Sequence, residues 1–257
     1  MKRIFLFIGV VFIALVTTAQ EYIYIIEKDS HYLQEKVVVA VNDVDSISFV
    51  APSECMENGY EWVDLGLPSG LKWATCNVGA TKPEEYGNYY AWGETTPKDS
   101  FNWGNYKYCT ATYDSENEKW TVNGLTKYYS TIDNKTTLDP EDDAATVNMG
   151  GLWRMPTRDE LNELKIKCTL AWINDYNGTG VAGIKATSKT NNNHIFLPAS
   201  GYQSGKSLHM SEYAGYYLSS ECNGSYVKDL EILSYSILIS SDEKRRYCGL
   251  SVRAVCP

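Results

Sequence analysis

The stretch GGLWRMPTRDELNELK, residues 150–165, decides the fold because it contains a complete helix start. Thr157 and Glu160 have the spacing of a capping box, in which the Thr hydroxyl accepts from the Glu backbone N–H and the Glu carboxylate accepts from the Thr backbone N–H. Pro156 restricts the backbone just before the cap, and Asp159 adds negative charge near the positive end of the helix dipole. The stretch therefore predicts that a helix begins directly after Thr157.

The residues after this cap have the spacing of one buried helix face. Leu161, Leu164 and Cys168 stand at positions i, i+3 and i+7, which share one side of an α-helix. We expect a helix from about residue 158 to 168 that packs this face against a sheet. The stretch indicates a fold and does not reveal a specific biochemical activity.

The first 19 residues have the composition of an export signal. Lys2 and Arg3 precede an almost unbroken apolar run over residues 4–16, and small residues follow at 17–19. The run is short for a membrane span, and no second long apolar stretch follows. We therefore predict a protein exported to the periplasm, the cell surface or the medium, with no membrane span after signal removal. A retained N-terminal anchor is the alternative.

Acidic residues outnumber basic ones, 32 against 23, and give a net charge of −9. Removing Lys2 and Arg3 with the signal leaves 21 basic residues against 32 acidic ones, a net charge of −11. Such a protein is repelled by the phosphates of nucleic acids and by anionic lipids. We expect neither among its partners.

The mature chain has two parts. Residues 20–57 form a short β-rich leading segment, with strands expected at 22–26, 36–41 and 45–50. Three short strands make a poor independent core, so this segment is expected to dock on the main domain or to lead into it. Residues 58–257 form one domain, which is long enough to bury a core.

The main domain predicts strands, one helix, long loops and further strands. A hairpin is expected from residues 60–65 and 71–76. Residues 79–151 have weak periodicity, which predicts mostly ordered loops with short strands and a brief helical turn at 141–147. Later strands are expected at 194–198, 215–220, 230–240 and 250–256. This order predicts an α+β fold.

Six stretches of the main domain follow one another as they do in a known family. They are WVDLGLPSGLKWATCNVGA at 62–80, YAWGE at 90–94, DPEDDAA at 139–145, the stretch at 150–165, IFLPASG at 195–201 and GLSVRAVC at 249–256. On these residues, the region 60–257 resembles the Fibrobacter succinogenes major paralogous domain, which is abundant in exported proteins of Bacteroidetes-type bacteria.

The resemblance implies a fold. The family is similar to C-type-lectin-like domains, particularly to the branch that contains the formylglycine-generating enzymes. That fold has a small twisted antiparallel sheet, flanking helices and long loops that carry a variable surface. The family has no established general activity, so the resemblance implies a fold and a compartment but no reaction.

Seven cysteines in an exported chain predict disulfide bonds and at least one remaining thiol. The disulfide candidates are Cys76, Cys168, Cys222, Cys248 and Cys256. A bond from Cys168 to Cys256 would tie the helix to the core sheet, and a bond from Cys222 to Cys248 would join late strands. The sequence leaves the connectivity open.

The free thiol is expected from a departure from the family pattern. Relatives often carry a cysteine at the position of Tyr129, where it would be the natural partner of Cys109. The resemblance therefore makes Cys109 the candidate for the free thiol, with Cys55 as the rival.

Catalytic patterns are weak. Formylglycine generation uses a closely spaced cysteine pair, whereas Cys248 and Cys256 are eight residues apart and suit a structural role better. Residues 201–207 (GYQSGKS) resemble a phosphate-binding loop but have one residue too few between the glycines. No nucleophile is paired with a base. We expect a protein that is not an enzyme.

A cluster of carboxylates suggests one possible metal site. Asp139, Glu141, Asp142 and Asp143 lie within five residues, and calcium prefers several oxygen ligands. The alternative is a helix start, where carboxylates accept from backbone N–H groups and meet the dipole. The helix start is favoured, so no cofactor is expected and calcium is a secondary candidate.

Aromatic residues give the best functional hint, with 20 Tyr and 7 Trp in the chain. The tryptophans at 62, 73, 92 and 153 lie beside apolar residues and are expected in the core. The ligand-binding candidates stand among polar residues of the irregular middle: Trp103, Tyr106, Tyr108, Tyr113 and Trp120. Exposed Trp and Tyr form flat platforms for sugar rings or protein partners. A packed loop is the alternative.

These features predict a non-catalytic binding or adhesion module of a bacterial cell envelope, whose ligand is a glycan or a protein. Two alternatives stay open. One is an enzyme of the formylglycine-generating type, and the other is a structural subunit of the envelope or of a pilus.

Overall fold

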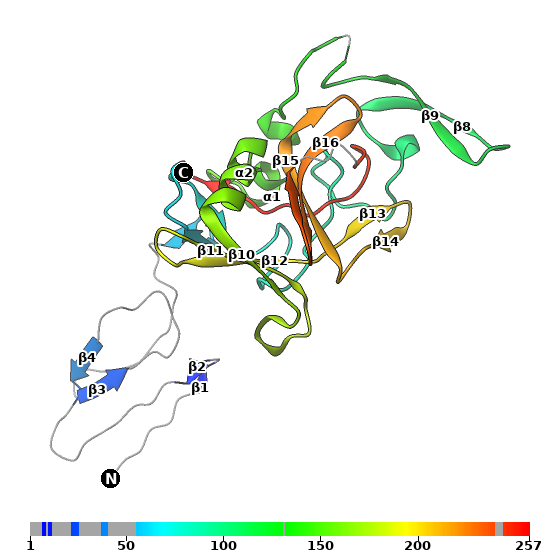
Figure 1. Cartoon of the computed structure of the whole chain (residues 1–257). Helices are drawn as coiled ribbons and strands as arrows, with labels where there is room; N and C mark the ends of the chain where they lie inside the picture. Colours follow the sequence, from blue (N-terminus) through cyan, green and yellow to red (C-terminus); the bar gives the residue numbers. More distant parts are fainter. Residues whose placement is uncertain are drawn as a thin grey trace. The chain divides into compact units, whose positions relative to one another are not determined.

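The computed structural model describes residues 55–130, 132–239 and 244–257, and four short strands before them (Figure 1). The chain divides into two compact units, Met1–Ser53 and Glu54–Pro257. Each unit is described by itself.

The first unit contains two antiparallel strand pairs. They are β1 (Phe7–Ile8) with β2 (Val10–Val11), and β3 (Tyr22–Ile25) with β4 (Val37–Ala40). The strands expected at 22–26 and 36–41 are thus confirmed. The strand expected at 45–50, and the predicted signal peptide 1–19 apart from β1 and β2, lie outside the described residues.

The second unit begins and ends in one four-stranded sheet of order β18-β7-β6-β5. Its strands are β5 (Met56–Glu57), β6 (Tyr60–Asp64), β7 (Lys72–Ala74) and β18 (Val255–Cys256). The predicted hairpin is confirmed, because Val63 pairs with Trp73 across β6 and β7. Since β5 pairs with β6, the division between the units falls before the predicted boundary at residues 57 and 58.

A hairpin follows the short helix η3 (Trp103–Asn105). Its strands are β8 (Cys109–Asp114) and β9 (Lys119–Leu125), which form a separate two-stranded sheet. Figure 1 shows this hairpin projecting from the rest of the unit. The sequence predicted mostly loops here, because polar residues on both faces weaken the alternation that marks a half-buried strand.

The helices lie where the sequence places them. The short helix η4 (Pro140–Asp142) and α1 (Ala144–Met149) cover the helical turn expected at 141–147, and α2 (Arg158–Lys167) follows the capping box. The Glu160 N–H donates to Thr157 Oγ1 (3.2 Å), and the Thr157 N–H donates to Glu160 Oε2 (2.8 Å). Helix α2 ends one residue earlier than predicted, since Cys168 begins the next strand.

The later chain forms three further sheets. The first has the order β10 (Cys168–Ile173), β11 (Gly183–Ser188), β12 (His194–Pro198), with the short helix η5 (Tyr176–Gly178) between β10 and β11. The second pairs β13 (Tyr202–Ser204) with β14 (Ser207–His209). The third has the order β15 (Ala214–Asn223), β16 (Tyr226–Leu233), β17 (Ile237–Ile239).

Two late strands differ from the prediction. The single strand expected at 230–240 is divided between β16 and β17 by a turn, in which the Leu233 N–H donates to the Ser236 carbonyl (2.7 Å). The strand expected at 250–256 is regular only in β18, while Leu250 and Ser251 make isolated bridges to Tyr90 and Tyr217. Strand β12 has the predicted bounds, and β10 and β11 were not predicted.

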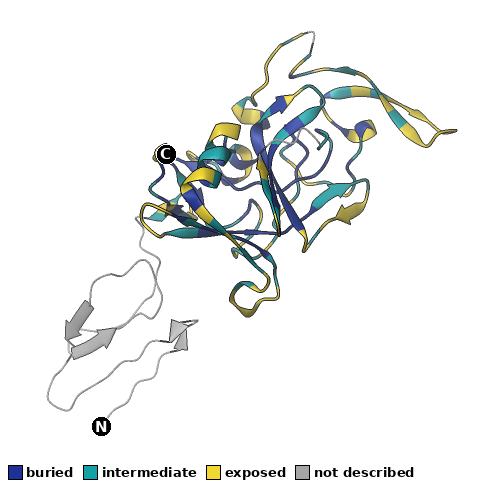
Figure 2. Cartoon of the chain, in the orientation of Figure 1, coloured by how far each residue is buried: buried dark blue, intermediate teal, exposed yellow. Residues whose placement is uncertain are grey.

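Two clusters of buried side chains form the core of the second unit. Figure 2 marks the buried residues of this unit in dark blue. One contains Trp92 and Trp153, and the other contains Trp73 with the helix residues Leu161 and Leu164. These three tryptophans are at most 1% exposed, as expected, while Trp62 is only partly buried against the first cluster. Cys168 also belongs to the second cluster, so the predicted inner face of α2 is confirmed.

The described residues form a small β-rich α+β fold, in which two α-helices accompany many short antiparallel strands. No helix within the described ranges has the length and the apolar character that crossing a membrane requires.

The predicted bond between Cys168 and Cys256 is absent from the structure. Cys76, Cys109, Cys168, Cys222, Cys248 and Cys256 are all thiols. Cys168 lies in the core cluster of Trp73, whereas Cys256 lies in that of Trp92, because successive side chains of β18 point to opposite faces. Cys222 and Cys248 share one cluster, but the structure contains no bond between them either.

Candidate functional site

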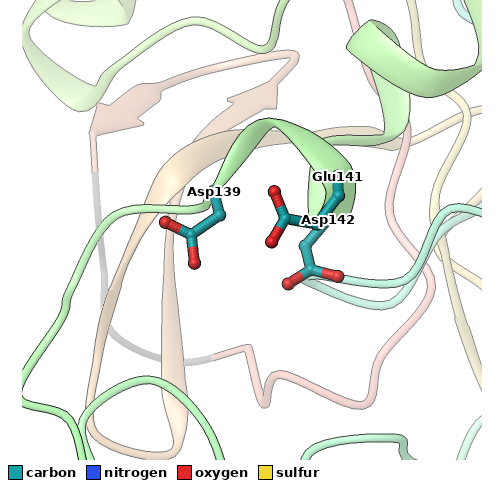
Figure 3. Close-up of side chains that lie close together, drawn as sticks. All are labelled: Asp139, Glu141 and Asp142. Carbon is teal, nitrogen blue, oxygen red and sulfur yellow. The ribbon is translucent and has the colours of Figure 1, made fainter.

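The acidic segment at 139–143 is neutralised from within the chain. Asp139, Glu141 and Asp142 bring their carboxyl groups close together at η4 (Figure 3). The Lys127 ammonium lies among them, with its Nζ 3.0 Å from Asp139 Oδ2, 3.7 Å from Glu141 Oε1 and 2.5 Å from Asp142 Oδ2. A lysine therefore supplies positive charge where a calcium ion would have to bind.

Asp142 is the centre of this arrangement, and its side chain is buried. Besides Lys127, its carboxylate accepts from the hydroxyls of Tyr108 and Tyr128 and from Lys107 Nζ (3.1 Å). Burial raises the pKa of Asp142, but these hydrogen bonds outweigh burial and hold the pKa well below its usual range. We call these five residues the Asp142 cluster.

Asp143 has the role of a helix cap. Its Oδ1 accepts from the backbone N–H groups of Ala145 (2.8 Å) and Thr146 (3.0 Å), and its Oδ2 accepts from Met155 (2.9 Å). These contacts fix the start of α1 and hold the stretch before α2 against it. They favour the helix-start interpretation of the carboxylates over calcium binding.

Three of the five aromatic candidates were assigned wrongly to an exposed surface. Trp103, Tyr106 and Tyr108 are 9%, 4% and 6% exposed. The Tyr106 hydroxyl donates to the Trp92 carbonyl (2.8 Å) and accepts from Arg246 Nε (3.0 Å), and the Tyr108 hydroxyl donates to Asp142. The two tyrosine hydroxyls find partners inside the protein, so the tyrosine rings can be buried without losing hydrogen bonds.

The other two candidates lie opposite each other on the projecting hairpin. Tyr113 on β8 pairs with Trp120 on β9, and the ring centroids are 5.0 Å apart. Tyr113 is 48% exposed, whereas Trp120 is partly buried against the core. A Cβ atom on Gly104 would lie 2.1 Å from the Trp120 ring, so η3 and the hairpin are in close contact there.

A groove of about 600 Å³ opens beside this contact. Its walls are Phe101, Asn102, Trp103, Glu118, Lys119, Trp120, Thr121, Val122, Ser204, Gly205, Ser225, Arg245 and Tyr247. We call it the hairpin groove. It brings two of the predicted residues, Trp103 and Trp120, together with residues more than 80 positions away in the sequence.

The aromatic walls of the hairpin groove are held by neighbouring groups. The Trp103 and Tyr247 rings meet edge to face with centroids 4.9 Å apart. The Arg245 guanidinium carbon lies 4.0 Å from the centre of the Tyr226 ring. Burial raises the pKa of Tyr247, so its hydroxyl stays protonated at neutral pH and can donate a hydrogen bond.

The sequence prediction missed Arg245 and Tyr247. They belong to the run Lys244-Arg245-Arg246-Tyr247, where three basic residues precede an aromatic one. That concentration of positive charge in an acidic chain was an available signal. The structure separates its members, since Arg246 is fully buried while Arg245 lines the groove.

A second pocket of about 340 Å³ lies beside β5 and β7. Its lining includes Met56, Tyr60, Cys76 and Met149. Burial raises the pKa of the Cys76 thiol, which disfavours the reactive thiolate. The lining of this pocket contains no tryptophan and no basic side chain, whereas the hairpin groove has both, so the hairpin groove is the stronger candidate.

The cysteines and the phosphate-loop-like stretch have structural surroundings. Cys248 and Cys256 are 5% and 2% exposed, and burial raises both pKa values, that of Cys256 to about 11. Residues 201–207 form β13 and the turn into β14, whereas a phosphate-binding loop would lead into a helix.

Comparison with known proteins adds no relative. No family model matches the chain, and no curated protein or solved structure is similar to it. The resemblance to the Fibrobacter succinogenes major paralogous domain thus stays a prediction that depends on its sequence stretches.

Proposed function

We propose that this protein is an exported, non-catalytic binding module of a bacterial cell envelope and that the hairpin groove binds a glycan. The observation that carries the proposal is the placement of Trp120 and Trp103 in one groove with hydroxyl, amide and charged side chains. The proposal includes membership of the Fibrobacter succinogenes major paralogous domain and a C-type-lectin-like fold. The order of the six stretches and the short antiparallel sheets support both.

The shape of the groove favours a glycan over a protein partner. A volume of about 600 Å³ is within the range of small-ligand sites. Sugar rings present an apolar face that packs on aromatic rings and a rim of hydroxyls that needs hydrogen bonds. Ser204 and Ser225 supply hydroxyl groups for such a rim beside the aromatic walls.

Two observations support the non-catalytic part of the proposal. The thiols of Cys248 and Cys256, which the enzyme alternative requires in an open cleft, are buried and have raised pKa values. The Asp142 carboxylate, which has a strongly shifted pKa, is occupied by partners from the same chain. Export follows from the composition of residues 1–19.

A glycan array probed with the mature chain tests the proposal. We expect binding to at least one oligosaccharide, and we expect Trp120→Ala to weaken it more than tenfold, because the variant removes one aromatic wall. Tyr235→Ala is the matched control, since Tyr235 is 84% exposed and does not line the groove. Glycan binding that Trp120→Ala leaves unchanged would overturn the assignment to this groove, and the capture of proteins alone would overturn the ligand class.

A further inference from the structure

We infer that the ligand of the hairpin groove carries a carboxylate, as a uronic or sialic acid residue does, and that Arg245 binds this carboxylate. The inference rests on the proposed function and deepens it. Arg245 lines the groove and is only partly buried, and its guanidinium is stacked on the Tyr226 ring.

The next residue in the chain, Arg246, has a purely structural role and serves as a comparison. Arg246 is fully buried, and its guanidinium donates to the Tyr106 hydroxyl (3.0 Å) and to the carbonyls of Tyr128 (2.9 Å) and Lys127 (3.2 Å). Every nitrogen of Arg246 therefore has a partner inside the protein.

Among the residues that the structure describes, Arg245 has no such set of partners. Within residues 55–130, 132–239 and 244–257, no carboxylate forms an ion pair with it, whereas Arg154 binds Glu160 through two nitrogens (2.8 and 2.7 Å). Stacking on Tyr226 restrains the guanidinium and leaves its N–H edge able to donate. The groove thus contains a positioned cation that lacks a counter-charge among the described residues.

A carboxylate matches this group best. The planar guanidinium donates two parallel hydrogen bonds to the two oxygens of a carboxylate. Lys119 adds a second positive charge to the groove walls and Glu118 one negative charge, so the local charge is positive. The net charge of −9 repels an approaching carboxylate over long distances. Salt screens this repulsion beyond about 8 Å at physiological ionic strength.

The hairpin groove also offers contacts for the rest of the sugar. Trp120 and Tyr247 line the same groove as Arg245, so an aromatic ring can pack on the sugar face while the guanidinium holds the carboxylate. A neutral sugar would use the aromatic walls and leave Arg245 without a counter-charge. The predicted preference for an acidic sugar therefore depends on Arg245, and the predicted binding itself depends on Trp120.

The test uses the mature chain and an array of oligosaccharides with galacturonate, glucuronate or sialate termini, each beside its carboxyl-reduced counterpart. We expect binding to an acidic member at least tenfold tighter than to its reduced form. Arg245→Gln should abolish this difference, and Arg245→Lys should retain part of it. Thermal unfolding of both variants should match the wild type, which separates a binding effect from a folding effect.

The possible outcomes distinguish this inference from the proposed function. Equal binding of acidic and reduced forms, with both lost in Trp120→Ala, would overturn the carboxylate inference and keep the groove as a glycan site. A preference for acidic sugars that survives Arg245→Gln would also overturn the inference. Binding to no member of either series would overturn the inference and the glycan proposal together.

Discussion

The Asp142 cluster and the hairpin groove use the same kinds of side chain in opposite ways. Both combine aromatic rings with charged groups, and residues 101–128 contribute to both. In the cluster, Asp142 finds Lys127 and two tyrosine hydroxyls, so its charge is satisfied within the chain. In the groove, Arg245 has an aromatic support but no described counter-charge. The comparison teaches that the charge of Asp142 has its partners within the chain, whereas among the described residues Arg245 has no carboxylate partner, which is the basis of the proposed ligand site.

Removing the central carboxylate should have the largest effect on stability. Asp142→Ala leaves the hydroxyls of Tyr108 and Tyr128 without their acceptor and removes the shortest of the three carboxylate contacts of Lys127, which together should cost about 4 kcal/mol. Urea unfolding at pH 7 measures the loss. Glu141→Ala is the control, because the Glu141 side chain is 71% exposed and should contribute less than about 1 kcal/mol. Equal losses in the two variants would contradict a central role of Asp142.

Substitutions of the two adjacent arginines should differ in their effect on stability, because we expect one arginine to stabilise the fold and the other to bind the ligand. Arg246→Gln removes a buried guanidinium with four hydrogen-bonded partners and should lower the free energy of unfolding by about 3 kcal/mol. Arg245→Gln should lower that free energy by no more than about 1 kcal/mol, because Arg245 lies on the groove wall and loses mainly its stacking on Tyr226. Chemical denaturation of both variants checks this contrast. Equal destabilisation by Arg245→Gln and Arg246→Gln would contradict the prediction.

Acid should weaken the Asp142 cluster in a defined direction. The pKa of Asp142 is depressed in the folded protein, so its stabilising contribution is fully present above the unfolded-state pKa of about 3.9 and is lost as the pH falls through the folded-state pKa. Melting temperatures between pH 7 and pH 2 should show a steeper fall for the wild type than for Asp142→Asn. Parallel curves for the two proteins would show that another group controls acid unfolding.

The smallest expected effect on stability comes from a change at Gly104, which contacts the Trp120 ring. In Gly104→Ala, the new Cβ would lie 2.1 Å from the indole ring, so the ring must move. Because Trp120 is partly exposed, we expect a loss of only about 1 kcal/mol in stability together with weaker glycan binding. Gly124→Ala on β9 is the control, since its Cβ would have no neighbour closer than 3.9 Å. Unchanged glycan binding by Gly104→Ala would mean that the position of Trp120 is unimportant.

Much of the local structure could be predicted from the sequence. The capping box at Thr157, the helix that follows it, the hairpin of β6 and β7 and the bounds of β12 are specified by neighbouring residues. Strands β8 and β9 were missed because they carry polar residues at many positions, and the regular form of β8 to β11 depends on pairing with a neighbouring strand.

The candidate site was only partly predictable. Trp120 and Trp103 were singled out as aromatic residues in a polar segment, and both line the hairpin groove. The same argument placed Tyr106 and Tyr108 on the surface, but both are buried. Composition could not distinguish these cases, because the partners of the buried rings, such as Arg246, come from the other end of the chain.

The sequence by itself therefore determined the elements whose stabilising contacts are local, above all the capped helix α2 and the hairpin of β6 and β7. Only the tertiary structure decided which charges are satisfied. Lys127 meets Asp142 across a loop, and Arg245 stands beside Trp120 although 125 positions separate them. The physical reason is that a helix cap depends on groups within one turn of the chain, whereas the burial of a ring or the pairing of a charge depends on which distant segments the packed core brings together.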